Sequence, residues 1–294
     1  MKYTIALSFL MFSGLLIAKD QTISSNTPIN ETKKTEFLRI KSDANNVPTA
    51  LQLANARYVP IDGIPDDMYV DLISVVHVAD KSYYENLNEL FKTYDVVLYE
   101  LVAEEGTRVG DKKASQGKSL LSSVQQGMKE VLGLSFQLEE VDYSPKNFVH
   151  ADISPEDFKN SMDEKGESFV SMFMRMWLVG LQQQVTNPNA VNNVQLMSAL
   201  FSSNRERDLK VIAAKQFMEM DPVMNALEGD NGSTIVTTRN LKALKVLRQE
   251  IEKGNKTFAI FYGAAHMPEM EEVMMKEFKL KPDQVNWVDA WDLR

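Results

Sequence analysis

The chain of 294 residues contains no cysteine. It therefore has no disulfide, no thiolate ligand for zinc, no cysteine nucleophile and no lipid attached through a cysteine. Any metal must be held by His, Asp, Glu or similar ligands. Histidine is also scarce, because the chain has only His77, His150 and His266. The position of each histidine is consequently worth examining.

Basic residues are outnumbered, with 32 Lys and Arg against 41 Asp and Glu, which gives a formal net charge of −9. No cluster of Lys and Arg makes a local exception, and this argues against nucleic acid as a partner. P-loop, Gly-x-Gly-x-x-Gly and Ser-His-Asp patterns are missing too, so nucleotide binding and classical serine hydrolysis have no support.

The N-terminus carries a short apolar run, after Lys2, that ends at Ala18. Residues 1–18 are typical of a secretory signal peptide, with an uncleaved anchor as the alternative. Residues 19–35 are rich in Ser, Thr, Asn and Lys and predict a flexible linker. We therefore expect an exported protein, periplasmic or secreted, with no stable membrane span after cleavage and a single domain over 36–294.

Apolar runs predict a parallel sheet in this domain. Residues 36–62 alternate in short pieces, as in a β-hairpin or meander. The run 68–77 is typical of a strand buried on both faces, and 96–102 is a second one. Between them a helix begins at Asp80 or Ser82, which makes a βαβ unit with parallel strands. With 258–262 as a third strand, the fold class is α/β: a central mixed, largely parallel sheet flanked by helices.

The rest of the chain is mainly helical in pattern. Residues 118–228 predict a Met-rich helical insertion. Helices are expected over 234–253 and 268–278, and an edge strand over 284–293. The methionines of the insertion indicate adaptable core packing or a pocket wall. They include Met162, Met172, Met176, Met197 and Met218.

Three residues whose side chains can bind a metal ion lie at or just after the ends of the predicted parallel strands. His77 ends the first, Glu100 lies near the end of the second, and His266 follows the third. Since the carboxyl ends of parallel strands meet at one edge, these side chains should converge there. Two imidazoles and a carboxylate suit a divalent ion such as zinc, manganese or cobalt. A structural, salt-bridged Glu100 is the alternative, because a carboxylate in an apolar strand needs a cationic partner.

The third histidine lies beside a carboxylate, in the segment before a helix that starts at Ser154. There His150 could be a further metal ligand or a proton shuttle, whereas Asp152 is expected to cap the turn. Arg239 and Asn240 enter a later helix ahead of its apolar face. Such an arginine could face solvent or point at an anionic group in the site.

Four short motifs resemble a known family. They are Ser74-Val-Val-His77, Val96-Val-Leu-Tyr-Glu100, Arg239-Asn240 and Gly263-Ala-Ala-His266. In order and rough spacing they are similar to motifs of the TraB, GumN, PrgY and Tiki superfamily, related in fold to erythromycin-esterase and ChaN-like proteins. The resemblance covers about residues 65–294, and departs in having serine at 74 where the family motif has glycine.

The resemblance implies that His77, Glu100 and His266 build the active site, with Arg239 and Asn240 as accessory residues. Tiki members are described as metal-dependent membrane proteases. The sequence therefore predicts an exported metal-dependent hydrolase, peptidase-like, acting on a peptide or small molecule. A Mn, Co or Zn ion would lower the pKa of a bound water, Glu100 would ligate or act as base, and Arg239 would steady an oxyanion. The alternatives are a non-catalytic peptide- or haem-binding protein and a metal-free esterase.

Overall fold

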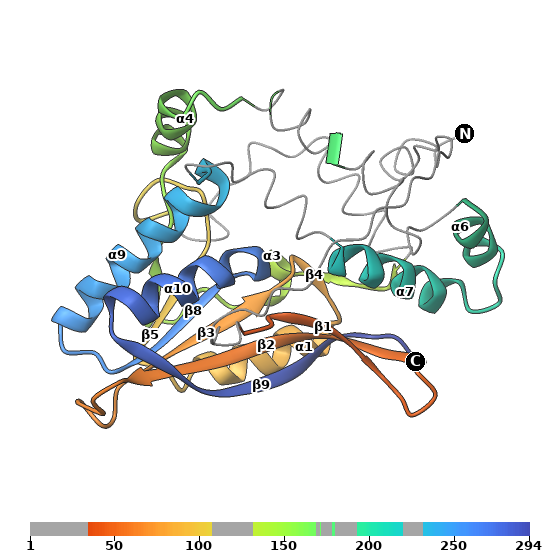
Figure 1. Cartoon of the computed structure of the whole chain (residues 1–294), viewed down its shortest axis with the longest axis horizontal. Coiled ribbons are helices and arrows are strands. Elements are labelled where there is room, and N and C mark those ends of the chain that lie inside the picture. The colour runs from red at the N-terminus through yellow and green to blue at the C-terminus, as the bar shows by residue number, and fades with distance from the viewer. Residues whose placement is uncertain (1–34, 108–131, 169–170, 172–177, 180–192, 220–231) are drawn as a thin grey trace, which may run out of the picture.

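The fold is described from a computed structural model, which describes residues 35–107, 132–168, 171, 178–179, 193–219 and 232–294 (Figure 1). The predicted signal peptide, nearly all of the predicted linker and parts of the predicted helical insertion lie outside these residues. The described strands are β1 Leu38–Ser42, β2 Pro48–Pro60, β3 Tyr69–Val75, β4 Val78–Ala79, β5 Val96–Tyr99, β6 Ser135–Phe136, β7 Phe148–His150, β8 Thr257–Gly263 and β9 Leu280–Asp292.

The central sheet has seven strands and joins a parallel half to an antiparallel half. β3, β8, β5 and β7 lie in this order, and each is parallel to its neighbour. One edge of the long β2 pairs antiparallel with β1 and then with β3, and its opposite edge pairs with β9. The predicted hairpin and edge strand are thus confirmed. β4 and β6 form a separate two-stranded ribbon.

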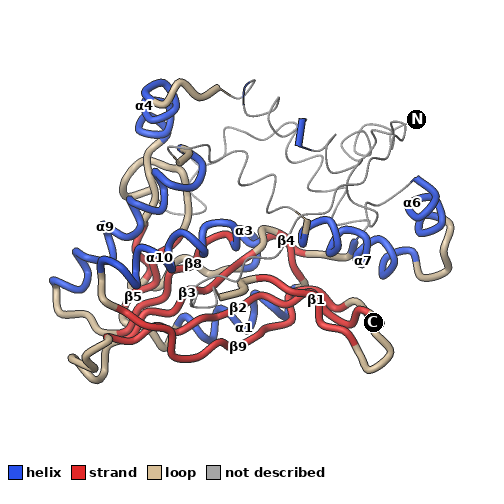
Figure 2. Tube along the Cα trace, in the orientation of Figure 1, coloured by secondary structure: helices blue, strands red, loops and turns tan. Residues whose placement is uncertain are grey.

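Helices cover both faces of the sheet, as Figure 2 shows. α1 packs on one face, and α9 and α10 pack on the other. The strand β8 shows why, since Ala259 and Phe261 contact the α1 side while Phe258, Ile260 and Tyr262 contact the α9 and α10 side. A strand apolar on every residue is stable only between two such layers. The described α-helices are α1 Lys81–Phe91, α3 Gln137–Glu140, α4 Pro155–Glu164, α6 Asn193–Leu200, α7 Arg205–Met218, α9 Arg239–Glu252 and α10 Met267–Glu277.

The βαβ prediction is confirmed in direction. β3 and β5 run parallel with α1 between them in sequence, but they are not neighbours, because β8 lies between them. The mixed α/β class with a largely parallel centre is therefore observed.

Several local predictions differ from the structure. Of the two predicted starts of α1, Asp80 is the N-cap and Ser82 is not, but the Asp80 side chain makes no capping hydrogen bond and accepts from Lys210. The expected helical insertion over 118–228 contains β7, which joins the central sheet. Three residues are too few for a strand to show a periodicity.

The methionines of the insertion divide where the structure describes them. Met162 is buried, whereas Met197 and Met218 are exposed; Met172 and Met176 lie outside the described residues. Across the described ranges, none of the helices combines the length and the apolar character needed to cross a bilayer.

Candidate functional site

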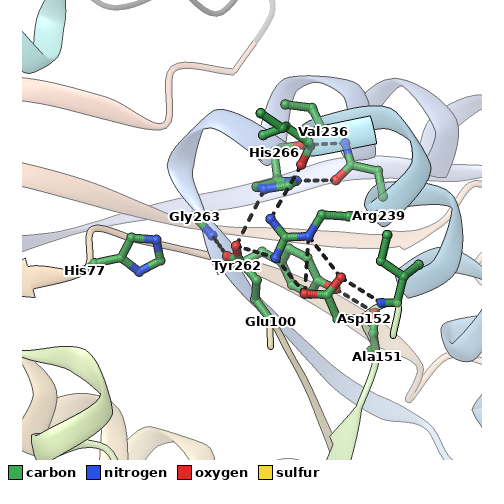
Figure 3. Close-up of polar contacts among 12 residues, drawn as sticks. His77, Glu100, Ala151, Asp152, Val236, Arg239, Tyr262, Gly263 and His266 are labelled. Atoms are coloured by element: carbon green, nitrogen blue, oxygen red, sulfur yellow. Dashed lines mark hydrogen bonds and ion pairs between the residues drawn. The ribbon is translucent and has the colours of Figure 1, made fainter. Parts of the chain in front are cut away.

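The carboxyl ends of β3, β8 and β5 meet at one edge of the sheet, as predicted. His77 lies two residues beyond β3, Glu100 directly follows β5, and His266 ends a 3-10 turn, Ala264–His266, after β8. Figure 3 shows Glu100, Arg239 and His266 gathered there, with His77 to the side of Gly263. The topology thus brings together residues far apart in sequence.

Glu100 is the centre of this group. Its Oε1 accepts from Arg239 Nη2 at 2.7 Å and its Oε2 from the Gly263 N–H at 2.8 Å. The side chain is only 9% exposed. Burial by itself raises the pKa of Glu100, but His266, Arg239, His77 and the Gly263 N–H outweigh it and lower that pKa to about 2. Glu100 is therefore ionised at all ordinary pH values, and Arg239 is the cationic partner that a carboxylate after an apolar strand needs.

Arg239 also forms an ion pair with a second carboxylate, that of the fully buried Asp152. Asp152 accepts from Arg239 Nε at 2.9 Å and Nη2 at 2.5 Å. Burial lowers the pKa of Arg239, but the hydrogen bonds to Asp152 together with the negative charges of Glu100 and Asp152 more than reverse that effect, so the guanidinium stays charged. Nη1 makes only a 3.5 Å contact with the Ile235 carbonyl. Nη1 is thus the one guanidinium nitrogen not committed to a carboxylate.

The structure gives Asp152 a larger role than the predicted cap of the turn. Ser154 is the N-cap of α4 and accepts from the Asp157 N–H, as predicted for this helix start. Asp152 accepts from the Ile153 N–H at 2.8 Å and, with no side-chain exposure, also neutralises Arg239. A buried cation between two carboxylates is stable only when all partners are present.

His266 is a buried, neutral imidazole. Its Nδ1 lies 2.6 Å from Asn240 Oδ1, and its Nε2 lies 3.7 Å from Glu100 Oε1. Burial lowers the pKa of His266 to about 4, and the attraction of Glu100 offsets only part of that effect. Nδ1 carries the proton, since an amide oxygen only accepts. The lone pair on Nε2 therefore faces Glu100.

Asn240 lies in the first turn of α9, directly after a π-helical turn over Thr234–Thr238. Its Nδ2 donates to the His266 carbonyl at 3.2 Å and to Glu269 Oε2 at 2.6 Å. π-Helical turns often occur at functional sites. The helix predicted over 234–253 therefore begins with this different geometry, which presents Arg239 and Asn240 to the sheet edge.

His77 is exposed, and a separate set of contacts orients it. Its Nδ1 lies 3.0 Å from Gln137 Oε1, and its carbonyl accepts from the Gln137 N–H. Gln137 Nε2 donates to the Tyr143 hydroxyl at 3.0 Å. With Oε1 turned to the imidazole, Nδ1 is the protonated nitrogen of His77 as well, and Nε2 has the free lone pair. Both histidines are therefore oriented by a side-chain amide.

Ser74, which stands where the first family motif has glycine, has a structural role away from the site. Ser74 is fully buried, and its hydroxyl lies 3.0 Å from the Phe37 carbonyl and 2.9 Å from the Ala54 carbonyl. These belong to the antiparallel half of the sheet. By contrast, Gly263 is inside the site, where an added Cβ would meet Glu100 Oε2 at 3.4 Å. A Cβ at that distance makes an ordinary van der Waals contact, so the role of Gly263 in the site is its N–H, which donates to Glu100 Oε2.

His150 is not in the predicted loop, because it ends β7. Its Nε2 contacts the Leu101 carbonyl at 2.6 Å, and its ring lies against Tyr99, 5.7 Å between centroids. Tyr99 contacts the α1 side of the sheet, whereas Glu100 meets Arg239 on the α9 side. The described contacts of His150 therefore lie outside the group around Glu100.

The donors present suit a divalent ion in kind. The two Nε2 lone pairs and the ionised Glu100 are the nitrogen and oxygen ligands that Mn, Co and Zn accept, and the amide partners at Nδ1 are typical of outer-shell support for metal-bound histidines. In the ranges that the structure describes, however, no three His, Asp or Glu side chains gather closely enough to form a ready cage.

Four residues of the site carry no sequence signal that identifies their role. Asp152 acts through its hydrogen bonds with Arg239, and Glu269 through one with Asn240. Gln137 acts through its contact with His77, and Tyr143 by accepting from Gln137. Compared with models of known protein families, with curated proteins and with solved structures, the chain matches none.

Proposed function

We propose that the protein is an exported hydrolase, peptidase-like, whose reaction takes place between His266 and Glu100. The observation that carries the proposal is the pair of acceptors, His266 Nε2 and Glu100 Oε1, facing each other at 3.7 Å. Neither atom has a proton to give the other above about pH 4. A water or a cation placed between them would satisfy both.

The residues of the chain have distinct roles in such a hydrolysis. His266 Nε2 takes a proton from water while the water oxygen bonds to the carbonyl carbon and the C=O electron pair moves to oxygen. Arg239 Nη1 donates to that developing negative charge. The imidazolium then gives its proton to the leaving nitrogen or oxygen as the scissile bond breaks. Asn240 Oδ1 and the ionised Glu100 stabilise the positive charge in between.

A divalent ion gives a second form of the proposal. His77 and His266 would hold it together with Glu100, and when bound it would supply a water of lowered pKa and polarise the carbonyl. In this form the His266 Nε2 lone pair would be taken by the ion, and Glu100 rather than His266 would accept the proton. The specific observation in favour is the orientation of both histidines by amide oxygens, which leaves both Nε2 atoms free. The low pKa of His266 also keeps this nitrogen available, since a proton competes with a metal for the same lone pair.

Further support comes from the four motifs that resemble the TraB, GumN, PrgY and Tiki superfamily, and we propose membership of it on that basis. Export is proposed from the signal-like N-terminus, which lies outside the described residues.

The test is a hydrolysis screen with p-nitrophenyl acetate and fluorogenic peptides, with and without EDTA, beside calorimetric titration with Mn, Co and Zn. Activity that EDTA removes and one metal restores supports the metal-dependent hydrolase. Activity that survives EDTA supports the metal-free esterase with His266 as base. H266A and H77A should lose metal binding, and H150A is the matched control.

No turnover in any condition would contradict the hydrolase and leave the ligand-binding alternative. Absorbance after adding haem then tests one version of that alternative, because bound haem shifts its Soret band.

A further inference from the structure

The side-chain amide of Asn240 can sit in its place in one orientation only. Its Nδ2 faces the His266 carbonyl at 3.2 Å and Glu269 Oε2 at 2.6 Å. Both of these groups only accept hydrogen bonds, so the NH2 end must face them. The oxygen end is thereby turned to His266 Nδ1, at 2.6 Å. The partners of the Asn240 amide thus decide the tautomer of His266, in which Nδ1 carries the proton.

Glu269 is the stronger of the two acceptors. It is in the first turn of α10, where the helix N-terminus favours an ionised carboxylate. A hydrogen bond to an ionised acceptor is about twice as strong as a neutral one. The carbonyl at 3.2 Å is a weaker partner. Without Glu269, a half-turn of the amide would present NH2 to Nδ1 and move the imidazole proton to Nε2.

We propose that Glu269 is a positioning residue that acts through Asn240 to keep His266 Nε2 unprotonated. The inference rests on the proposed function, because Nε2 is the atom that takes the proton from water or meets a cation there. In the described part of the chain, no hydrogen bond or ion pair joins Glu269 to Glu100 or Arg239. Glu269 therefore affects the reaction only by orienting the side-chain amide of Asn240.

The experiment uses the full chain, metal-free after EDTA treatment and labelled with 15N-histidine. With three histidines, the ring nitrogens can be assigned by comparing wild type with H77A and H150A. We expect a protonated Nδ1 and an unprotonated Nε2 for His266 at pH 7. In E269A a second signal with protonated Nε2 should appear. E269Q keeps an acceptor oxygen and should retain the wild-type spectrum, as should E272A, an exposed glutamate on the same helix.

Activity provides a separate readout. In E269A, kcat for the substrate found in the screen should fall about 10- to 100-fold with KM unchanged, as for other outer-shell partners of a reacting histidine. E269Q should recover most of it. A loss in kcat with an unaltered His266 spectrum would overturn the positioning role.

The spectrum separates this inference from the proposed function, since it needs no substrate. A tautomer change in E269A without any hydrolysis by wild type supports the positioning role and contradicts the hydrolase. Should E269A not fold, the wild-type spectrum still decides, because a His266 protonated at Nε2 would overturn the inference.

Discussion

Arg239 and Asp152 form the most buried ion pair of the site, with 2.5 Å between Nη2 and Oδ2 and no exposure of the Asp152 side chain. This pair fixes the guanidinium beneath Glu100 and keeps Glu100 ionised. Glu100 in turn faces the lone pair of His266. The geometry of the candidate site therefore depends on a carboxylate that touches neither histidine among the described contacts.

Substituting D152N should destabilise the protein strongly. The carboxamide cannot neutralise Arg239, and breaking a buried pair by removing one partner typically costs about 3–5 kcal/mol. Urea unfolding measures the loss. The control is D163N, which breaks the exposed Lys159–Asp163 pair and should cost about 0–1 kcal/mol. Equal effects of the two substitutions would contradict the structural role of Asp152.

The substitution E100Q should lower stability, because Arg239 loses one of its two carboxylate partners, but Asp152 still pairs with Arg239 and the protein should fold with strongly reduced activity. The carboxamide oxygen can still accept from Arg239 or Gly263, but the charge that faces His266 is lost. We expect kcat to fall about 100-fold, the lower range of acid–base contributions. Glu100 raises the pKa of His266, so its removal should lower that pKa further in an NMR titration. A rise of the His266 pKa in E100Q would contradict this account of the pair.

Much of the parallel half of the fold could be predicted, because a strand buried on both faces is apolar at every position. β5 and the centre of β8 show this pattern, β3 shows it apart from Asp71 and Ser74, and each strand is followed by a candidate site residue. The three-residue β7 could not be found in this way. Its place in the sheet depends on pairing with β5, which no local pattern encodes.

The candidate site likewise has residues whose place could be predicted from the sequence and residues whose place could not. His77, Glu100 and His266 could be placed at one edge because strand direction alone decides which side chains meet. The residues that hold them in position could not be placed in this way. Asp152 and Glu269 look like helix-start residues in sequence, and only tertiary structure brings them within hydrogen-bond distance of Arg239 and Asn240.

The substitution S74G introduces the glycine of the motif that this sequence resembles and should lower stability without loss of activity. The hydroxyl meets two buried carbonyls of Phe37 and Ala54, and one such hydrogen bond contributes about 1 kcal/mol. Glycine in a strand adds roughly 0.5–1 kcal/mol of backbone entropy. Thermal unfolding of S74A and S74G separates the two effects. A large fall in kcat for S74A would show that the hydroxyl acts on His77 after all.

Stability should fall in two overlapping steps as the pH is lowered. The folded-state pKa of His266 is about 4 against an ordinary 6.5, so between these values the unfolded chain binds a proton that the folded chain does not. Stability therefore decreases as the pH falls from about 6.5 to 4. The pKa of Glu100 is lowered from 4.5 to about 2 in the folded protein. By the same reasoning, stability decreases further as the pH falls from about 4.5 to 2.

Urea unfolding of the EDTA-treated protein at pH 7.5, 5.5 and 4.5 checks the upper step. H266Q removes the titrating ring, so the difference in stability between pH 7.5 and 4.5 should be smaller than in wild type, even if H266Q is less stable throughout. The same substitution at exposed His77 is the control and should leave the wild-type pH dependence in place. An unchanged pH dependence in H266Q would mean that His266 is not held neutral by burial, and the lone pair facing Glu100 would then lose its basis.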